Sequence, residues 1–160
     1  MRATFNIPST VICGAGAIGE LATQLLRLRV TRVLLVTDGF MVHSGLAGRV
    51  ESDLRGAGVA VETFAGVQPD PTEQAVLDGL ARYRAARAEA IVALGGGSPI
   101  DCAKAVAILT TNPPPLSLYM GRHKVPRTGA PLLAIPTTAG TGSEVTKVAV
   151  ITDAVNEVKM

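Results

Sequence analysis

Residues 91–104 have the sequence IVALGGGSPIDCAK, an apolar run followed directly by three glycines and then by a helical pattern. The run 91–94 has the length and side chains of a strand buried on both faces of a sheet. Ser98 stands where a helix N-cap is expected, Pro99 suits the first helical position, and Asp101 would fall in the first turn. A strand, a glycine turn and a helix in this order predict a parallel α/β unit.

The glycine turn in this unit is a candidate anion site. Consecutive glycines let the backbone approach a ligand closely and adopt positive φ angles. The unpaired N–H groups at the start of the following helix can bind an anion such as a pyrophosphate. The alternative is a tight turn with a well-capped helix and no ligand. That turn would not need three glycines, which cost backbone entropy, so the sequence favours a phosphate-binding loop at 95–98.

The rest of the chain continues the alternation of strands and helices. Apolar residues at helical spacing predict three further helices, over about 18–26, 46–54 and 71–83. Short apolar or alternating runs predict three further strands, at 33–36, 59–64 and 132–135. This order predicts a Rossmann-like, doubly wound parallel α/β sheet.

The chain after this predicted sheet has a different character. Residues 112–130 contain three consecutive prolines and are expected to form a long surface loop. Residues 145–152 are expected to be the first strand of a β-hairpin whose second strand has only begun at Val158 and is cut short. An unfinished hairpin leaves strand edges unpaired, which favours a homo-oligomer formed through this C-terminal edge.

Composition excludes several classes of protein. The chain has 160 residues, 48% of them hydrophobic and 3% aromatic, and a net charge of +2, so we expect one domain with an aliphatic core and no nucleic-acid partner. Cys13 and Cys102 lie far apart and predict neither a disulfide framework nor a zinc site. The N-terminus lacks the apolar core of a signal peptide, and no apolar run approaches ~18 residues. We therefore expect a soluble, cytoplasmic protein with no membrane partner.

A second candidate loop, PTTAGTGSE at 136–144, follows the predicted strand 132–135. It gathers small hydroxyl side chains and glycines at the carboxyl end of a strand, where open α/β sheets bind their ligands. A Ser/Thr-rich loop without a ligand is an equal alternative at this stage.

A third motif, GAGAIG at 14–19, matches the G-x-G-x-x-G dinucleotide fingerprint, with Asp38 about 20 residues further on. The segment 8–13 before it is a poor strand, so a tight helix-entry turn is the favoured interpretation of these glycines. Asp38 remains a candidate in its own right. A carboxylate at the end of strand 33–36 can accept both ribose hydroxyls and repel a 2′-phosphate, although a capping role in a turn is nearly as good an explanation.

The GGGSPIDCAK loop, followed about 40 residues later by PTTAGTGSEVT, resembles the iron-containing (group III) alcohol dehydrogenase family. Glycerol dehydrogenases and dehydroquinate synthases are more distant relatives. The resemblance runs from about Phe5 to the last residue, and VTDGF, GVQPDPT and VAVITD support it. It also implies that GAGAIG is a structural turn.

Members of this family bind NAD(P) in an N-terminal α/β domain and hold a divalent metal, usually iron, in an all-helical C-terminal domain. The resemblance implies that residues 1–160 are the cofactor-binding domain and that the helical metal-binding domain is absent. Asp38 would bind the adenosine ribose, which implies NAD over NADP, with Asp70 near the adenosine and Lys159 reaching a ribose. Asp101 and Lys104 would organise the phosphate loop. The implied cofactor-binding residues are Asp38, Asp70, Gly95, Gly96, Gly97, Ser98, Asp101, Thr137, Thr138, Thr141 and Lys159.

The family's metal ligands, one Asp and three His, all lie beyond the last residue of this chain. His43 and His123 stand on separate segments without metal-ligand spacing, so we expect no metal ligand and no catalytic residue here. In a complete enzyme, hydride would pass between a primary or secondary alcohol and NAD, whereas this chain alone is expected to be inactive. Two alternatives remain: a stand-alone NAD(H)-binding module or half of a split enzyme, and a metal-independent relative such as a maleylacetate reductase, which the motif forms favour less.

Overall fold

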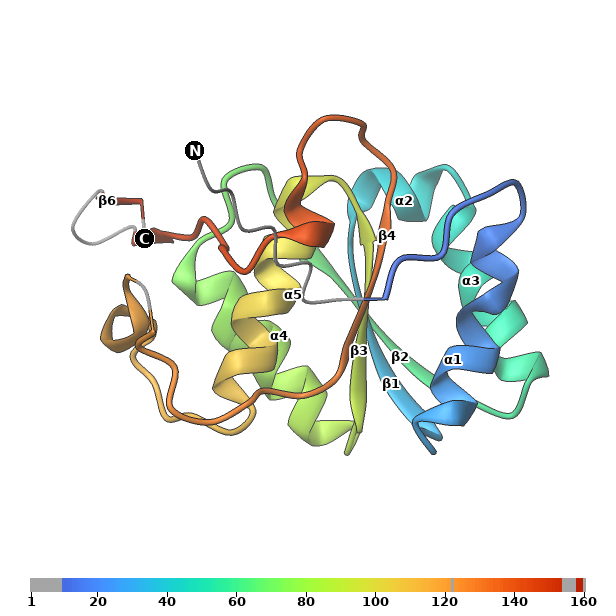
Figure 1. The fold of residues 1–160 in the computed structure, drawn as a ribbon, viewed down its shortest axis with the longest axis horizontal. Coiled ribbons are helices and arrows are strands. Elements are labelled where there is room, and N and C mark those ends of the chain that lie inside the picture. The colour runs from blue at the N-terminus through green and yellow to red at the C-terminus, as the bar shows by residue number, and fades with distance from the viewer. Residues whose placement is uncertain (1–9, 122, 154–157, 160) are drawn as a thin grey trace, which may run out of the picture.

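The fold is built on a four-stranded, all-parallel sheet with the order β2-β1-β3-β4 (Figure 1). The computed structural model describes residues 10–121, 123–153 and 158–159. The strands are β1 (Arg32–Asp38), β2 (Ala60–Val67), β3 (Ala90–Gly95) and β4 (Leu132–Pro136). All four strands lie where the sequence predicts them, and the parallel order confirms the predicted α/β sheet.

Helices cover both faces of this sheet. On one face pack η1 (Ala17–Glu20), α1 (Leu21–Arg27) and α3 (Leu46–Gly56); on the other pack α4 (Glu73–Ala85) and α5 (Gly97–Leu109) (Figure 1). A short helix, α2 (Gly39–His43), follows β1 directly and was not predicted. No helix among the described residues is both long and apolar enough to cross a membrane.

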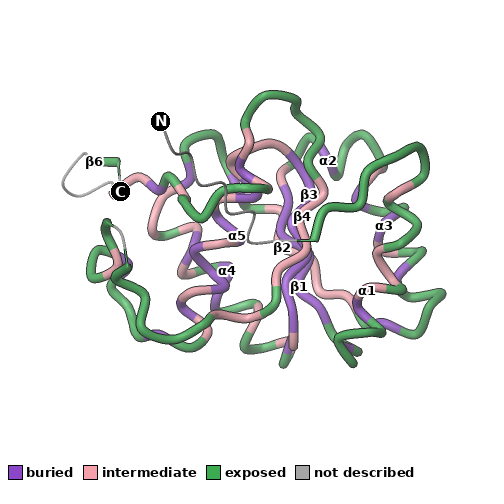
Figure 2. The backbone as a smooth tube through the Cα atoms, viewed as in Figure 1, coloured by how far each residue is buried: buried purple, intermediate pink, exposed green. Residues whose placement is uncertain are grey.

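Two apolar clusters, one on each face, hold the layers together. Leu34 and Ile91 point to the cluster under α4 and α5, whereas Leu35 and Val92 point to the cluster under α1 and α3. The central strands are therefore buried on both sides, and Figure 2 shows them as the most continuous buried stretch of the chain. This is why residues 33–36 and 91–94 are apolar without alternation.

The order in which the chain adds strands changes direction at the centre of the sheet, between β1 and β3, although all four strands are parallel. The chain leaves β1 toward β2 on one side, then crosses back past β1 to β3 and on to β4. The carboxyl ends of β1 and β3 are tied together there, because the Thr37 hydroxyl donates a 2.8 Å hydrogen bond to the Leu94 carbonyl. In an open α/β sheet, the crevice at such a switch point is where ligands bind.

Helix α5 begins two residues earlier than the capping pattern predicts. Gly96, not Ser98, is the N-cap, Gly97 is the first helical residue, and Pro99 occupies the third position. Gly95 makes the turn at φ 144°, which lets the helix begin at once. The first turn consequently contains no acidic residue, and Asp101 lies one turn further along the helix.

The expected hairpin is confirmed only at its tip. The strands β5 (Thr152–Asp153) and β6 (Val158–Lys159) pair antiparallel, but residues 145–151 do not form a strand. They follow the short helix η3 (Ser143–Val145), and their backbone groups bond to side chains of α5 instead of to a neighbouring strand. The predicted long loop at 112–130 contains one helical turn, η2 (Leu116–Tyr119).

Candidate cofactor site

A cavity of about 940 Å³ opens at the carboxyl ends of the four strands, over the switch point between β1 and β3. Each strand contributes the residues that follow it, so four separate segments of the sequence meet in one place. The cavity is lined by Asp38, Gly39, Phe40, Met41, Ser44, Leu46, Arg49, Val67, Gln68, Pro69, Gly96, Gly97, Ser98, Pro99, Thr137 and Thr138.

The glycine loop packs so tightly that side chains are excluded from it. A Cβ on Gly95 would lie 2.7 Å from Cγ of Pro99, and one on Gly96 would lie 2.9 Å from Oγ1 of Thr138. Gly96 and Gly97 therefore bring bare backbone to the cavity wall at the start of α5. The start of a helix is a place where backbone N–H groups can bind an anion.

The second candidate loop lies directly against the first. Gly95 and Pro136 are paired in the sheet, and the N–H of Thr137 donates a 2.9 Å hydrogen bond to the Gly95 carbonyl. Thr138 lines the cavity beside Gly96, and Thr141 lies 3.6 Å from the Cβ position of Gly97. The two loops that the sequence singled out therefore form one wall.

Asp38 serves as a helix cap and also lines the cavity. Its Oδ1 accepts a 2.9 Å hydrogen bond from the N–H of Met41 at the start of α2. Its Oδ2 lies 3.3 Å from the Cβ position of Gly95, on the side of the glycine loop. The two roles that the sequence offered as alternatives, a cap and a ligand-facing carboxylate, are thus compatible.

Helices α2 and α3 contribute lining residues that sequence reasoning missed. Phe40 is 73% exposed and forms part of the cavity wall next to Asp38. Arg49 and Asp38 are the two charged residues in the lining, so the cavity holds one charge of each sign. Arg49 carried no signal because it belongs to an ordinary exposed helix face, but an aromatic directly after a candidate acid could have drawn attention to Phe40.

Asp70 and Lys159 are brought together outside the cavity lining. Their side chains form a 2.7 Å ion pair and are 68% and 61% exposed. Asp70 follows Pro69, which does line the cavity, and has a positive φ of 54°. Contact of these two residues with a cofactor stays a prediction.

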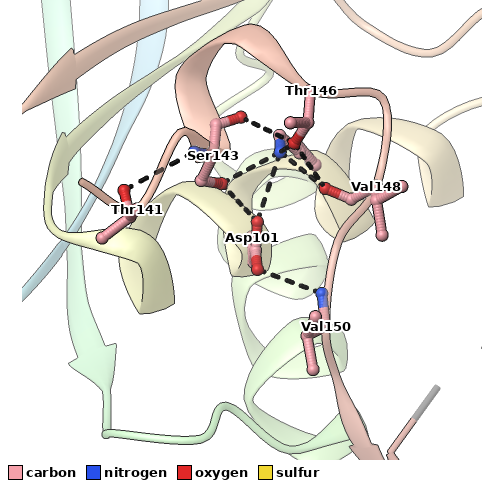
Figure 3. Close-up of polar contacts among 7 residues, drawn as sticks. Asp101, Thr141, Ser143, Thr146, Val148 and Val150 are labelled. Carbon is pink, nitrogen blue, oxygen red and sulfur yellow. Dashed lines mark hydrogen bonds and ion pairs between the residues drawn. The ribbon is translucent and has the colours of Figure 1, made fainter.

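Asp101 and Lys104 do not line the cavity but belong to a partly buried polar cluster, in which Figure 3 shows Asp101 beside Ser143 and Val150. The Lys104 ammonium group lies within hydrogen-bond distance of four oxygens: Asp101 Oδ1 (3.2 Å), Ser143 Oγ (2.9 Å), Thr146 Oγ1 (3.2 Å) and the Val148 carbonyl (2.7 Å). Burial lowers the pKa of Lys104, while Asp101 and Glu144 oppose that shift. Lys104 is therefore occupied by protein partners.

The remaining titratable candidates do not form a site. His43 and His123 are both exposed and lie on separate segments. Cys102 is fully buried, which raises the pKa of its thiol to about 12, with a smaller contribution from Asp101. Within residues 10–121, 123–153 and 158–159, no group of three or more His, Cys, Asp or Glu residues could hold a metal ion.

These features define an open parallel α/β fold with a cavity at the switch point of its sheet, which is where such sheets bind their ligands. Residues 8–160 match the family model of iron-containing alcohol dehydrogenases, and the chain belongs to that family.

Relatives of known function and structure agree with this assignment. The chain is 40% identical over 156 residues to an NAD-dependent methanol dehydrogenase of Bacillus methanolicus, covering 98% of this chain and 41% of that protein. It is similar in structure to a 1,3-propanediol oxidoreductase, with a TM-score of 0.94, 36% identity and coverage of 99% and 42%. A sulfoacetaldehyde reductase from Bifidobacterium kashiwanohense, solved in complex with NAD+, gives a TM-score of 0.89 at 34% identity, with coverage of 99% and 42%. The chain thus spans about two fifths of the length of these relatives.

Proposed function

We propose that this chain binds NAD(H) in the cavity over β1 and β3 and so acts as the cofactor-binding domain, residues 1–160, of an iron-type alcohol dehydrogenase. The observation that carries the proposal is the wall made by the two loops, in which a Cβ at Gly95 or Gly96 would collide with a neighbour. Ser98 and the N–H groups around Gly96 and Gly97 would hold the pyrophosphate at the start of α5.

The two ends of the cavity suit the two halves of the cofactor. Asp38 would accept hydrogen bonds from the adenosine ribose hydroxyls, and its negative charge would repel the 2′-phosphate of NADP. Thr137 and Thr138 line the cavity, and Thr141 lies beside Gly97; these three residues would face the nicotinamide half. NAD, when bound, would supply the hydride acceptor for an alcohol carbon, and this chain would orient the nicotinamide for that transfer.

The family metal has no counterpart site in the described part of the chain. The described acidic residues, histidines and cysteines include no group of three that could hold it. The substrate class, an alcohol or aldehyde, is supported by the similarity to a methanol dehydrogenase and to a sulfoacetaldehyde reductase. The alternative is a stand-alone NAD(H)-binding module. It predicts the same NAD(H) binding, but no assembly that contains the chain would oxidise an alcohol.

A fluorescence titration with NADH and NADPH tests the proposal, because the chain has no tryptophan to interfere with the cofactor signal. We expect saturable NADH binding and weaker NADPH binding. Asp38→Asn removes the charge but keeps a good helix cap. It should weaken NADH binding about tenfold and narrow the preference against NADPH, through loss of charge-assisted hydrogen bonds and of repulsion.

Asp53→Asn is the matched control, because it removes the same charge from helix α3 at a residue that does not line this cavity. This variant should bind both cofactors like the parent chain. If Asp38→Asn kept the parent chain's preference for NADH over NADPH, Asp38 would not be part of the cofactor site. The absence of NADH binding to the parent chain would refute the proposed function.

A further inference from the structure

The second loop is an arch that is fixed at both ends and lies against the glycine loop between them. At its start, Thr137 bonds to Gly95 and continues from β4. At its end, Ser143 is 6% exposed, and its hydroxyl donates to Asp101 and lies 2.9 Å from the Lys104 ammonium. Between these points, Gly140 and Gly142 have φ angles of 93° and 64°, so the arch itself is built from flexible residues.

The far end of the arch depends on two side chains from one turn of α5. Lys104 bonds to the Val148 carbonyl at 2.7 Å, and Asp101 Oδ2 accepts a 3.0 Å hydrogen bond from the N–H of Val150 (Figure 3). Residues 145–151 have no strand partner, so these side-chain bonds replace a backbone ladder. The side chains of Lys104 and Asp101 are only 12% and 14% exposed, whereas their partners Val148 and Val150 are exposed.

The ammonium is also the counterion of two acidic groups. Both Asp101 and Glu144 act on Lys104 electrostatically, and Glu144 Oε2 is buried without a hydrogen-bond partner among the described residues. Without Lys104, these two carboxylates would remain in a poorly solvated space with no cation. The end of the arch would then be pushed away from α5, and Thr138 and Thr141 would lose their fixed position over the glycine loop.

Resting on the proposed function, we infer that the Lys104–Asp101 pair is a clamp that positions the threonine arch for the nicotinamide half of the cofactor. Neither residue touches the cofactor. The glycine loop and Asp38 lie outside the clamp, so the adenosine diphosphate half binds independently of it. Lys104 and Asp101 are therefore positioning residues that set the affinity for one half of the dinucleotide.

Calorimetric titration with NADH and with ADP, which is the half of NADH that does not reach the arch, tests this inference. Lys104→Met should weaken NADH binding about tenfold and leave ADP binding within about twofold. Lys147→Met is the matched control, because it removes the same charge from an exposed position of the same segment. Thr146→Val removes one acceptor of the Lys104 ammonium without altering α5. It should weaken NADH binding by less than Lys104→Met does, and it should leave ADP binding unchanged.

Hydrogen exchange provides a second measurement that needs no cofactor. Lys104→Met should speed amide exchange over residues 143–150, including Val150, whereas Lys147→Met should not. Equal weakening of NADH and ADP, or unchanged exchange over 143–150, would overturn the clamp. If the parent chain bound neither ligand, the proposed function would fail, and the exchange rates would still decide whether Lys104 fixes the arch.

Discussion

Gly129 lies where the long loop returns to the sheet, and Gly129→Ala is the change that the geometry penalises most clearly. An added Cβ would lie 2.3 Å from the carbonyl oxygen of Ala107, 2.6 Å from its carbon and 2.9 Å from the nitrogen of Ile108. All three atoms belong to the backbone of α5, so no rotation of a side chain can relieve the overlap. The strand β4 and the helix must separate locally by about 1 Å to restore ordinary contact.

That separation breaks a small set of hydrogen bonds. The N–H of Ala130 donates to the Ala107 carbonyl at 3.2 Å and to Thr110 Oγ1 at 3.1 Å. Losing these bonds costs about 1 kcal/mol each, and the overlap itself costs about 1–3 kcal/mol. Alanine offsets less than about 1 kcal/mol of this by stiffening the unfolded chain. The net loss in the free energy of unfolding is therefore about 2–4 kcal/mol.

Urea unfolding followed by far-ultraviolet circular dichroism measures this loss. Gly48→Ala is the matched control, because Gly48 lies within α3 and its Cβ would meet nothing within 4 Å. The control should gain about 0.5–1 kcal/mol from helix propensity. A loss below about 0.5 kcal/mol in Gly129→Ala, with the control behaving as expected, would refute the packing argument at this junction.

Two further changes probe the site and its surroundings. Gly96→Ala places a Cβ 2.9 Å from Oγ1 of Thr138, a side chain that can shift. The free energy of unfolding should therefore fall by less than about 1 kcal/mol. The affinity for NADH, measured by fluorescence titration, should fall about tenfold. Equal affinity in the variant and the parent would show that this wall does not meet the cofactor. Cys102, with its thiol pKa raised from 9.0 to about 12, should resist thiol reagents in the folded chain while exposed Cys13 reacts. The stability that the neutral thiol contributes is complete below pH 9 and is lost as pH rises toward 12. Relative to Cys102→Ala, the free energy of unfolding should fall by about 1.4 kcal/mol per pH unit in that window, and a constant difference would contradict the assigned shift.

Two features could be predicted from the sequence: the parallel sheet, and the contact between the glycine loop and the loop at 136–144. Both depend on a small number of residues. Residues 33–36 and 91–94 are apolar without interruption, which only a doubly covered strand requires. Once the strands are parallel, the segments that follow β3 and β4 must lie at the same edge. The helix predicted over 71–83 is α4, whose N-cap is Thr72.

The failed details depend on tertiary contacts that no local pattern records. Helix α2 has five residues, too few to show a helical period. Residues 145–151 are rich in β-branched side chains, as strands are, but Asp101 and Lys104 from a distant helix bond to the backbone groups of Val150 and Val148. Arg49 lines the cavity because of where α3 packs, which its own neighbours in sequence do not reveal.

Because Asp38 has two roles, few substitutions at this position can change the proposed cofactor preference without destabilising the chain. The same carboxylate caps α2 and faces the cavity, so a substitution selected for a different nucleotide is also a substitution in a helix cap. Alanine or valine at this position would lose the cap together with the charge. Asparagine, serine and glycine keep most of the cap, so the mutational routes to a new cofactor preference narrow to these few residues.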